Sequence, residues 1–388
     1  MNIAFVVSSA EPGRDGIGDY TLSLAAALRS LGHPVLIVAL NDRWVSDVTG
    51  NDNAAGVALE RLPSSLPWTE RIDRACARLK DFRAEWVSFQ MSCYAYHRKG
   101  VLYAFNRHLR KLVAVCDHWQ VIFHELWIGF ESGASPRRRL VGALQRHFIK
   151  PAVQTLRPRL LQTSTPLFQA LLRTIGLEAS VLPLAGSIPV HPDPGAAWFL
   201  EALGGTHAGA RDGWLAGGFF GAIYLHWEPE PFFTSLRTVA RKTGQKVCIF
   251  SAGRMGAETI WNQLPAAYPD FRFEKLGELS VERVSQYLQN LDFGIAATPW
   301  LVIGKSSATA AMLDHGLPVM VTRNDSQPRL PLPIEPPADP LLILADRDVS
   351  DRFLAGLPRR APCHSSLDLA AEFVRRMEAA ASAPRLGS

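Results

Sequence analysis

A short turn in the second half of the chain combines groups that hold phosphate. Its residues are Gly304, Lys305, Ser306 and Ser307, and a helical pattern follows directly. The lysine supplies a positive charge, the serines supply hydroxyls, and the start of a helix offers free N–H groups to an anion. A Walker A motif would need a further glycine where Pro299 stands, which excludes an NTPase. The alternative is that Ser306 only caps the helix.

A second glycine-rich turn follows the first apolar run of the chain. It contains Gly16 and Gly18, and Asp19 and Tyr20 lead into a helical pattern. Glycines let a ligand approach the backbone, and a helix start can bind an anion or a sugar hydroxyl. The spacing is not GxGxxG, and the second strand is expected to end at Leu40 without an acidic residue, which disfavours a dehydrogenase. The alternative is a turn without a ligand.

Other polar groups are expected at the carboxyl ends of strands. His124 ends an apolar run and could bind a substrate hydroxyl or carry a proton, although a lone histidine can also be structural. In the second half, four residues fall in loops that could line one pocket: Gly221, His226, Arg254 and Gly277. Arg254 would bind a diphosphate and Gly277 would allow close approach of a base, with His226 near the diphosphate or the sugar.

Composition places the chain among ordinary globular proteins. It has 388 residues, 47% of them hydrophobic and 20% charged, which is more than one hydrophobic core normally serves. No apolar run reaches the roughly 18 residues of a membrane span, and five scattered cysteines show no CxxC spacing. We therefore expect a cytoplasmic protein without a disulfide framework or a zinc site.

The net charge of +5 is unevenly distributed. Residues 98–173 hold thirteen Lys and Arg but only three acidic residues, so the rest of the chain is net acidic. Basic residues around 137–139 could meet anionic lipid headgroups, a phosphorylated acceptor or nucleic acid. The alternative is a solvated helix face.

Hydrophobic periodicity predicts two α/β domains. Short apolar runs alternate with helical patterns up to about residue 185, a Pro- and Gly-rich stretch follows, and the alternation restarts near residue 214. Such alternation is typical of βαβ units with a parallel sheet. We expect a first doubly wound, Rossmann-like domain at 1–185, a linker at 186–213, a second such domain at 214–375 and a flexible tail at 376–388.

The ordered set of these motifs resembles GT-B glycosyltransferases, especially the family-4-like group that uses nucleotide sugars. The resemblance rests on Gly16 to Tyr20, the stretch Leu24 to Val35, His124, and second-half segments at Phe220-Gly221, Gly253, Gly277 and Ala311 to Val321. It implies two domains that face each other across a cleft, the second binding the donor and the first the acceptor. Members of this group commonly retain the anomeric configuration.

One part of the family pattern is missing. The resemblance would place two glutamates, eight residues apart, at positions that Ile303 and Ala311 occupy here, and the usual basic pair for the diphosphate is unclear. Lys305 and Arg254 could replace that pair, beside the donor ligands Gly221, His226, Gly277, Gly304, Ser306 and Ser307. His124 and Asp19 would handle the acceptor proton or sugar hydroxyls, and Gly16, Gly18 and Tyr20 would bind the acceptor.

The resulting prediction is transfer of a sugar from a nucleotide-diphosphate sugar to a glycan, lipid-linked or small-molecule acceptor, without a metal or other cofactor. The alternatives are a GT-B-shaped protein that binds a nucleotide sugar or glycan without transfer, and a nucleotide-sugar epimerase. We expect no nucleic-acid partner. The basic surface of the first domain could add peripheral contact with the inner face of an anionic membrane, and the fold points to cell-envelope or polysaccharide synthesis.

Overall fold

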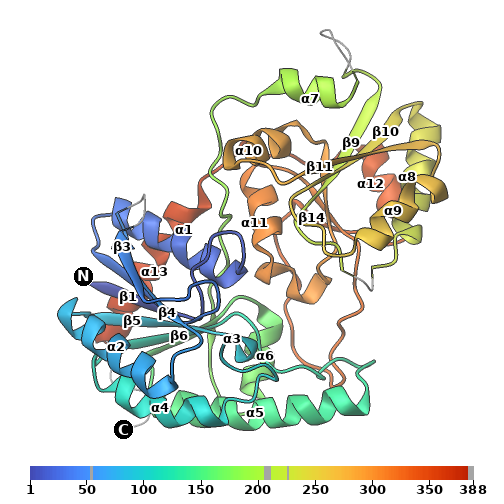
Figure 1. Cartoon of the computed structure of the whole chain (residues 1–388). Helices are drawn as coiled ribbons and strands as arrows, with labels where there is room; N and C mark the ends of the chain where they lie inside the picture. Colours follow the sequence, from blue (N-terminus) through green and yellow to red (C-terminus); the bar gives the residue numbers. More distant parts are fainter. Residues whose placement is uncertain (53–55, 205–210, 225–226, 383–388) are drawn as a thin grey trace. The chain divides into compact units, whose positions relative to one another are not determined.

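The computed structural model describes residues 1–52, 56–204, 211–224 and 227–382 (Figure 1). The chain divides into two compact units, and the expectation of two parallel-sheet α/β domains is confirmed. Unit 1 comprises 1–184, 327–335 and 366–388, and unit 2 comprises 185–326 and 336–365. The chain therefore returns from unit 2 to unit 1 twice, first for residues 327–335 and then from residue 366 onward.

Unit 1 is built on an eight-stranded sheet in the order β3-β4-β2-β1-β5-β6-β7-β8, in which only β3 runs antiparallel to its neighbour. Its strands are β1 Ile3–Val7, β2 Val35–Asp42, β3 Thr49–Asp52, β4 Ala58–Pro63, β5 Trp86–Met91, β6 Trp119–Phe123, β7 Leu160–Thr163 and β8 Ser180–Val181. Its helices are α1 Gly16–Ser30, α2 Trp68–Asp81, α3 Cys93–Tyr96, α4 Tyr103–Val113, α5 Pro136–Leu156, α6 Pro166–Arg173 and α13 Ser365–Ser382.

Unit 2 is built on a six-stranded parallel sheet in the order β11-β10-β9-β12-β13-β14. Its strands are β9 Trp214–Phe220, β10 Lys246–Ala252, β11 Phe271–Gly277, β12 Phe293–Ala296, β13 Val319–Val321 and β14 Leu342–Leu344. Its helices are α7 Ala196–Ala202, α8 Glu230–Thr243, α9 Glu258–Ala267, α10 Val281–Asn290, the 3₁₀ helix η1 Trp300–Lys305, α11 Ser307–Asp314 and α12 Val349–Ala355.

Both sheets of apolar strands are covered on two faces, as parallel sheets require. In unit 2 one buried core lies under α8 and α9, and a second lies under α10 and α11 (Figure 1). In each sheet the strand order reverses beside a central strand, at β1/β5 in unit 1 and at β9/β12 in unit 2. Ligands of doubly wound folds bind at the carboxyl ends of the strands at such switch points.

The expected domain boundaries need correction at both ends of unit 2. Part of the predicted linker is the helix α7, and its Phe199 and the following Leu203 are buried in the core of unit 2. The predicted flexible tail is wrong for residues 376–382, because α13 continues to Ser382 and buries Met377. Phe373 of α13 stacks on Phe5 of β1 at 5.8 Å between ring centroids, which attaches the helix to unit 1.

The expected end of the second strand is also wrong. The strand β2 continues to Asp42, so an acidic residue does stand at its carboxyl end. The Asp42 carboxylate is buried and accepts hydrogen bonds from the backbone N–H groups of Ala10 and Trp44 and from Arg61 Nε at 2.8 Å. Burial raises the pKa of Asp42, but these hydrogen bonds and the charge of Arg61 together bring it below its usual value. This carboxylate therefore stabilises the neighbouring loops, and most of its hydrogen-bonding capacity is already used.

Candidate functional site

The glycine-rich turn of unit 1 connects β1 to α1. Asp15 caps α1 by accepting from the N–H of Ile17 at 3.0 Å, and Asp19 accepts from the N–H of Gly13 at 2.7 Å. A Cβ at Gly18 would lie 2.6 Å from the carbonyl oxygen of Ser9, so this position requires glycine. A Cβ at Gly16 would meet nothing within 4 Å. Gly18 thus serves the packing of the turn, whereas Gly16 leaves open space at the helix start.

Tyr20 and His124 are in contact inside unit 1. Their rings meet edge to face with centroids 5.1 Å apart, and both side chains are buried. The Tyr20 hydroxyl has no hydrogen-bond partner within the described residues, and its burial raises its pKa. A buried hydroxyl without a partner is costly, and such groups often mark a ligand or functional position.

A chain of hydrogen bonds between buried polar side chains positions His124. His124 Nε2 lies 2.7 Å from Gln90 Oε1, and Gln90 Nε2 donates to Ser88 Oγ at 2.6 Å. This polar line continues across the sheet from Ser88 to Gln120 and from there to Gln162. Ser88, Gln90, Gln120 and Gln162 are fully buried, and each interaction runs in the same donor-to-acceptor direction.

This network assigns the protonation state of His124. With Gln90 Oε1 accepting, Nε2 carries the proton and Nδ1 keeps the lone pair. Burial lowers the pKa of His124 to about 4, although the nearby charge of Glu125 opposes this shift. His124 is therefore a neutral imidazole at pH 7 that can accept a proton or a hydrogen bond at Nδ1.

The carboxyl edge of the unit 2 sheet is lined by glycines. Gly221, Gly253 and Gly277 lie at the ends of β9, β10 and β11, and all three have positive φ, from 71° to 87°. They are joined by backbone hydrogen bonds, from Gly221 N to Ala252 O at 3.0 Å and from Gly253 N to Gly277 O at 2.7 Å. A ligand can therefore approach backbone atoms along three adjacent strand ends.

The turn at 304–307 lies beside this glycine edge. Ser306 caps α11 by accepting from the N–H of Thr309 at 3.2 Å, which confirms the capping interpretation without excluding a ligand. A Cβ at Gly221 would lie 3.6 Å from Cβ of Ala308, in the first turn of α11. Gly304 is exposed, and Lys305 and Ser307 are partly exposed. The structure thus brings Gly221 and the start of α11 together.

Arg254 is engaged in an ion pair in this structure. Its Nε lies 3.0 Å from Glu278 Oε1, and both side chains are largely exposed. An exposed pair of this kind contributes little stability and can exchange partners. His226, expected near the diphosphate, lies outside the described residues.

Sequence reasoning missed a second arginine at the unit 2 edge. Arg323 follows β13, its guanidinium lies 5.9 Å from the ring centroid of Tyr224, and it pairs with Asp325 at 2.6 Å. It also donates to the carbonyl oxygen of Ala297, at the end of β12. The sequence signal that could have identified Arg323 is its position two residues after an apolar strand. For the Gln line of unit 1 the signal was Ser88 and Gln90 alternating within an otherwise apolar run.

Across the described ranges, no helix combines the length and hydropathy of a membrane span. The same residues hold no cluster of three or more His, Cys, Asp or Glu side chains that could bind a metal ion.

Comparison with known proteins identifies the architecture. No family model and no curated protein matches the sequence, but solved structures match the fold. HepE of Anabaena, crystallised with UDP and glucose, has a TM-score of 0.54 at 12% identity, over 84% of this chain and 82% of that chain. The catalytic domain of starch synthase IV from Arabidopsis thaliana, bound to ADP and acarbose, has a TM-score of 0.52 at 12% identity, over 99% and 95%.

A third structure extends the same pattern. WaaG, a glycosyltransferase involved in lipopolysaccharide biosynthesis, has a TM-score of 0.51 at 13% identity, over 97% of this chain and 90% of that chain. At these identities the likeness establishes the fold. The chain has the GT-B fold, as the sequence motifs had predicted.

Proposed function

We propose that this chain is a glycosyltransferase that binds a nucleotide-diphosphate sugar on unit 2 and an acceptor on unit 1. The observation that carries the proposal is the glycine edge of unit 2, with the start of α11 beside it at the switch point of the sheet. Positive-φ glycines leave room for a nucleotide, and a helix start stabilises its diphosphate. The structures crystallised with UDP or ADP share this fold.

The proposed chemistry follows from charge and position. The developing negative charge on the leaving diphosphate would be stabilised by the N–H groups in the first turn of α11, which begins at Ser307, by Lys305 and by Arg254 once released from Glu278. On unit 1, neutral His124 would accept a hydrogen bond or proton from a sugar or acceptor hydroxyl. Asp19 is the second candidate for that proton or hydroxyl, and Gly16 and Tyr20 would bind the acceptor, with Gly18 keeping the turn packed closely enough to present them. We propose that neither a metal nor another cofactor takes part, and that a hexose is transferred with retention.

The direct test replaces Lys305 with alanine. We expect donor affinity to fall about tenfold, because one charge-assisted contact to phosphate is lost. Calorimetry against uridine, guanosine, adenosine and thymidine diphospho-sugars identifies the donor first and then compares variants. Lys275→Ala is the matched control, because Lys275 is a lysine of the same unit paired with Glu258 on its surface. Unchanged donor affinity and turnover in Lys305→Ala would remove the phosphate role.

A second candidate is a protein that binds the nucleotide sugar without transferring it. It is favoured by the two positions where the family pattern has glutamates, since Ile303 and Ala311 are apolar and buried. Incubation with the donor and an acceptor panel separates the two candidates. A transferase releases nucleoside diphosphate, whereas a binding protein only raises its melting temperature. Sugar isomerisation without any acceptor would instead indicate an epimerase.

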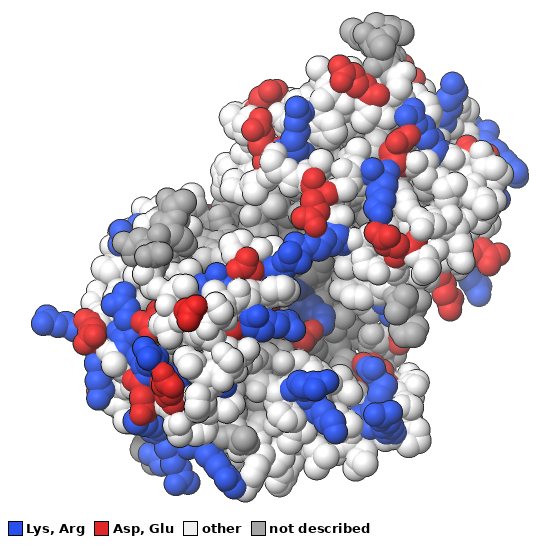
Figure 2. All heavy atoms as spheres, viewed as in Figure 1, with Lys and Arg blue, Asp and Glu red and all other residues white. Residues whose placement is uncertain are grey.

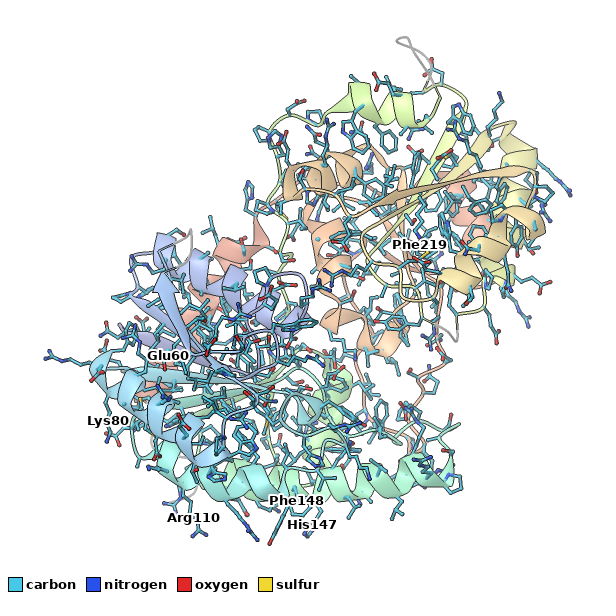
Figure 3. The ribbon with its side chains drawn as sticks, viewed as in Figure 1. Glu60, Lys80, Arg110, His147, Phe148 and Phe219 are labelled. Carbon is cyan, nitrogen blue, oxygen red and sulfur yellow. The ribbon has the colours of Figure 1, made fainter. Side chains whose placement is uncertain are left out.

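We also propose peripheral contact of unit 1 with an anionic membrane through α4 and α5. Leu140 and Leu144 are 65% and 46% exposed on α5, and Tyr103 is 54% exposed on α4. Basic side chains lie along this edge of unit 1, and Arg110 projects from it (Figures 2 and 3). Apolar side chains set among basic ones are typical of helices that lie on anionic bilayers.

Vesicle flotation tests this contact. We expect binding to phosphatidylcholine vesicles only when phosphatidylserine is included, and release at high salt. Leu140→Ser combined with Leu144→Ser should reduce flotation, and absence of flotation at low salt would leave a solvated helix face. Such a contact would place the protein at the inner face of a membrane, consistent with the expected role in cell-envelope synthesis. WaaG, which has a similar fold, is involved in lipopolysaccharide biosynthesis.

A further inference from the structure

A cavity in unit 1, separate from the contacts of Tyr20 and His124, combines arginines with an apolar wall. Its volume is about 290 Å³, and the described residues that line it include no acidic side chain. The basic groups are Arg139 and Arg146 of α5 and Arg329 of the segment 327–335. The apolar wall includes Trp127, Leu171 and Leu332.

One side of the cavity is formed by a segment that is distant in sequence. Residues 327–335 belong to unit 1 although the chain on both sides of them belongs to unit 2. They pair with the loop after β6 through hydrogen bonds from Ser132 N to Gln327 O and from Arg329 N to Phe130 O, both 2.9 Å. This pairing places Arg329 opposite the arginines of α5, an arrangement that no local sequence pattern reveals.

The floor of the cavity is rigid. A Cβ at Gly142 of α5 would lie 1.7 Å from the carbonyl oxygen of Ile128, so helix and loop touch through their backbones. Buried Gln145 accepts from the N–H of Ile128 at 2.9 Å and donates to the carbonyl oxygen of Lys99 at 2.8 Å. A preformed site loses little entropy when a ligand binds.

The arginines of the cavity retain donors for a ligand. Among the described residues, the Arg139 side chain makes one hydrogen bond, a long contact of 3.4 Å to the carbonyl oxygen of Ser132. Across the part of the chain that the structure describes, the side chains of Arg146 and Arg329 form no ion pair or hydrogen bond. Guanidinium groups bind phosphate through paired N–H donors, and three of them around one cavity favour a multiply charged anion.

We propose that this cavity binds a phosphate monoester that carries an apolar chain, with the phosphate on the arginines and the chain against Trp127, Leu171 and Leu332. The identification of this ligand as the acceptor rests on the proposed transferase function, whereas its binding does not. The loop that forms the cavity also begins at His124, three residues before Trp127. An acceptor held there would be anchored beside the strand end that carries His124.

Calorimetry of the full chain with decyl phosphate below its micellar concentration tests the proposal. We expect Arg146→Ala combined with Arg329→Ala to weaken binding at least about tenfold, and Ala143→Trp, which fills the cavity without removing charge, to do the same. Arg241→Ala combined with Lys242→Ala removes two exposed charges from α8 of unit 2 and should change nothing. Melting temperatures identify any variant that fails to fold. If one of the two cavity variants fails, the affinity of the other one tests the proposal.

Three further ligands define the recognised chemistry. Inorganic phosphate and neutral decyl maltoside should each bind more weakly than decyl phosphate by at least about tenfold, since each lacks one half of the interaction. Equal affinity for either compound, or cavity variants that bind decyl phosphate like the wild type, would overturn the proposal. Flotation with vesicles that contain or lack phosphatidic acid shows where the ligand comes from. Flotation that is lost in the cavity variants indicates a bilayer lipid, and absence of flotation indicates a soluble amphiphile.

Nucleoside diphosphate affinity, measured on the same variants, keeps the two proposals apart. If the chain binds decyl phosphate but no nucleoside diphosphate, the proposed ligand site in the cavity is supported and the proposed transferase function is rejected. Diphosphate binding that persists in the cavity variants is expected if the donor occupies unit 2.

Discussion

Each unit has its own doubly wound sheet, and the two sheets place different groups at their carboxyl edges. Unit 1 carries side chains there, with His124 held by Gln90 and a buried polar line behind it. At the edge of unit 2, the backbone of Gly221, Gly253 and Gly277 lies beside the start of α11, and the charged side chains there include Arg254 and Arg323. Side chains can move protons, whereas glycines and helix starts can only bind. Under the proposed function, proton transfer would fall to unit 1, whereas donor binding and stabilisation of the leaving diphosphate would fall to unit 2.

The largest expected effect comes from His124→Ala. We expect turnover to fall about 10²- to 10⁴-fold, the usual contribution of a general acid–base group, with nucleoside diphosphate affinity unchanged. Steady-state kinetics and calorimetry give the two quantities. His364→Ala, at an exposed histidine of unit 2, is the control. Equal losses of turnover and donor affinity would contradict the division of labour between the units.

The buried state of His124 should also appear in the pH dependence of stability. Its folded pKa of about 4 lies below the unfolded value near 6.5, so the unfolded chain binds more protons between these values. The free energy of unfolding should therefore fall as pH drops from 6.5 to 4, by about 3 kcal/mol in total. Urea unfolding of wild type and His124→Gln isolates this slope, because the contributions of His33 and His315, whose pKa values burial also lowers, are common to both.

Gln90→Leu tests whether the polar line positions His124. This change leaves the Nε2 proton of His124 without an acceptor, while Ser88 Oγ still donates to Gln120, and it should cost about 1–3 kcal/mol of stability. Gln90→Glu keeps an acceptor and adds a charge, so the pKa of His124 should rise in an NMR titration. A histidine whose pKa is the same in Gln90→Glu and the wild type would exclude the direct contact.

The smallest expected effect tests the glycine edge of unit 2. Gly221→Ala and Gly213→Ala both place a side chain at positive φ, 85° and 77°, and should each cost about 1 kcal/mol of stability. Only Gly221 lies beside α11, so only Gly221→Ala should weaken donor binding, by about tenfold. Equal donor affinity in the two variants would argue that the ligand does not approach this glycine.

The sequence predicted the parts of the molecule that depend on local pattern. Apolar runs located the central strands, and glycines at strand ends marked the edge of unit 2, because both features follow from neighbouring residues. The excursion of 327–335 into unit 1 and the return of α13 depend on contacts between distant segments, which no local pattern reveals. The end of β2 at Asp42 was missed because a charged residue is unusual inside a sheet unless its partners, here Arg61 and two N–H groups, are known.

The candidate site shows the same limit. His124 and Ser306 were found from their position after or before an apolar pattern. The protonation state of His124 could not be predicted, since it depends on Gln90 of the neighbouring strand and on complete burial. Arg254 was predicted as a diphosphate ligand from its loop alone, and its ion pair with Glu278 became visible only in three dimensions.

Ser307→Asp provides the most direct test of donor binding on unit 2. A carboxylate in the first turn of α11 interacts favourably with the helix dipole, so the melting temperature should stay the same or rise slightly. The same charge would repel a diphosphate at the helix start. We predict that calorimetry with the preferred nucleoside diphosphate gives at least tenfold weaker binding than in the wild type, about 1.4 kcal/mol. Unchanged affinity in this stable variant would contradict the account.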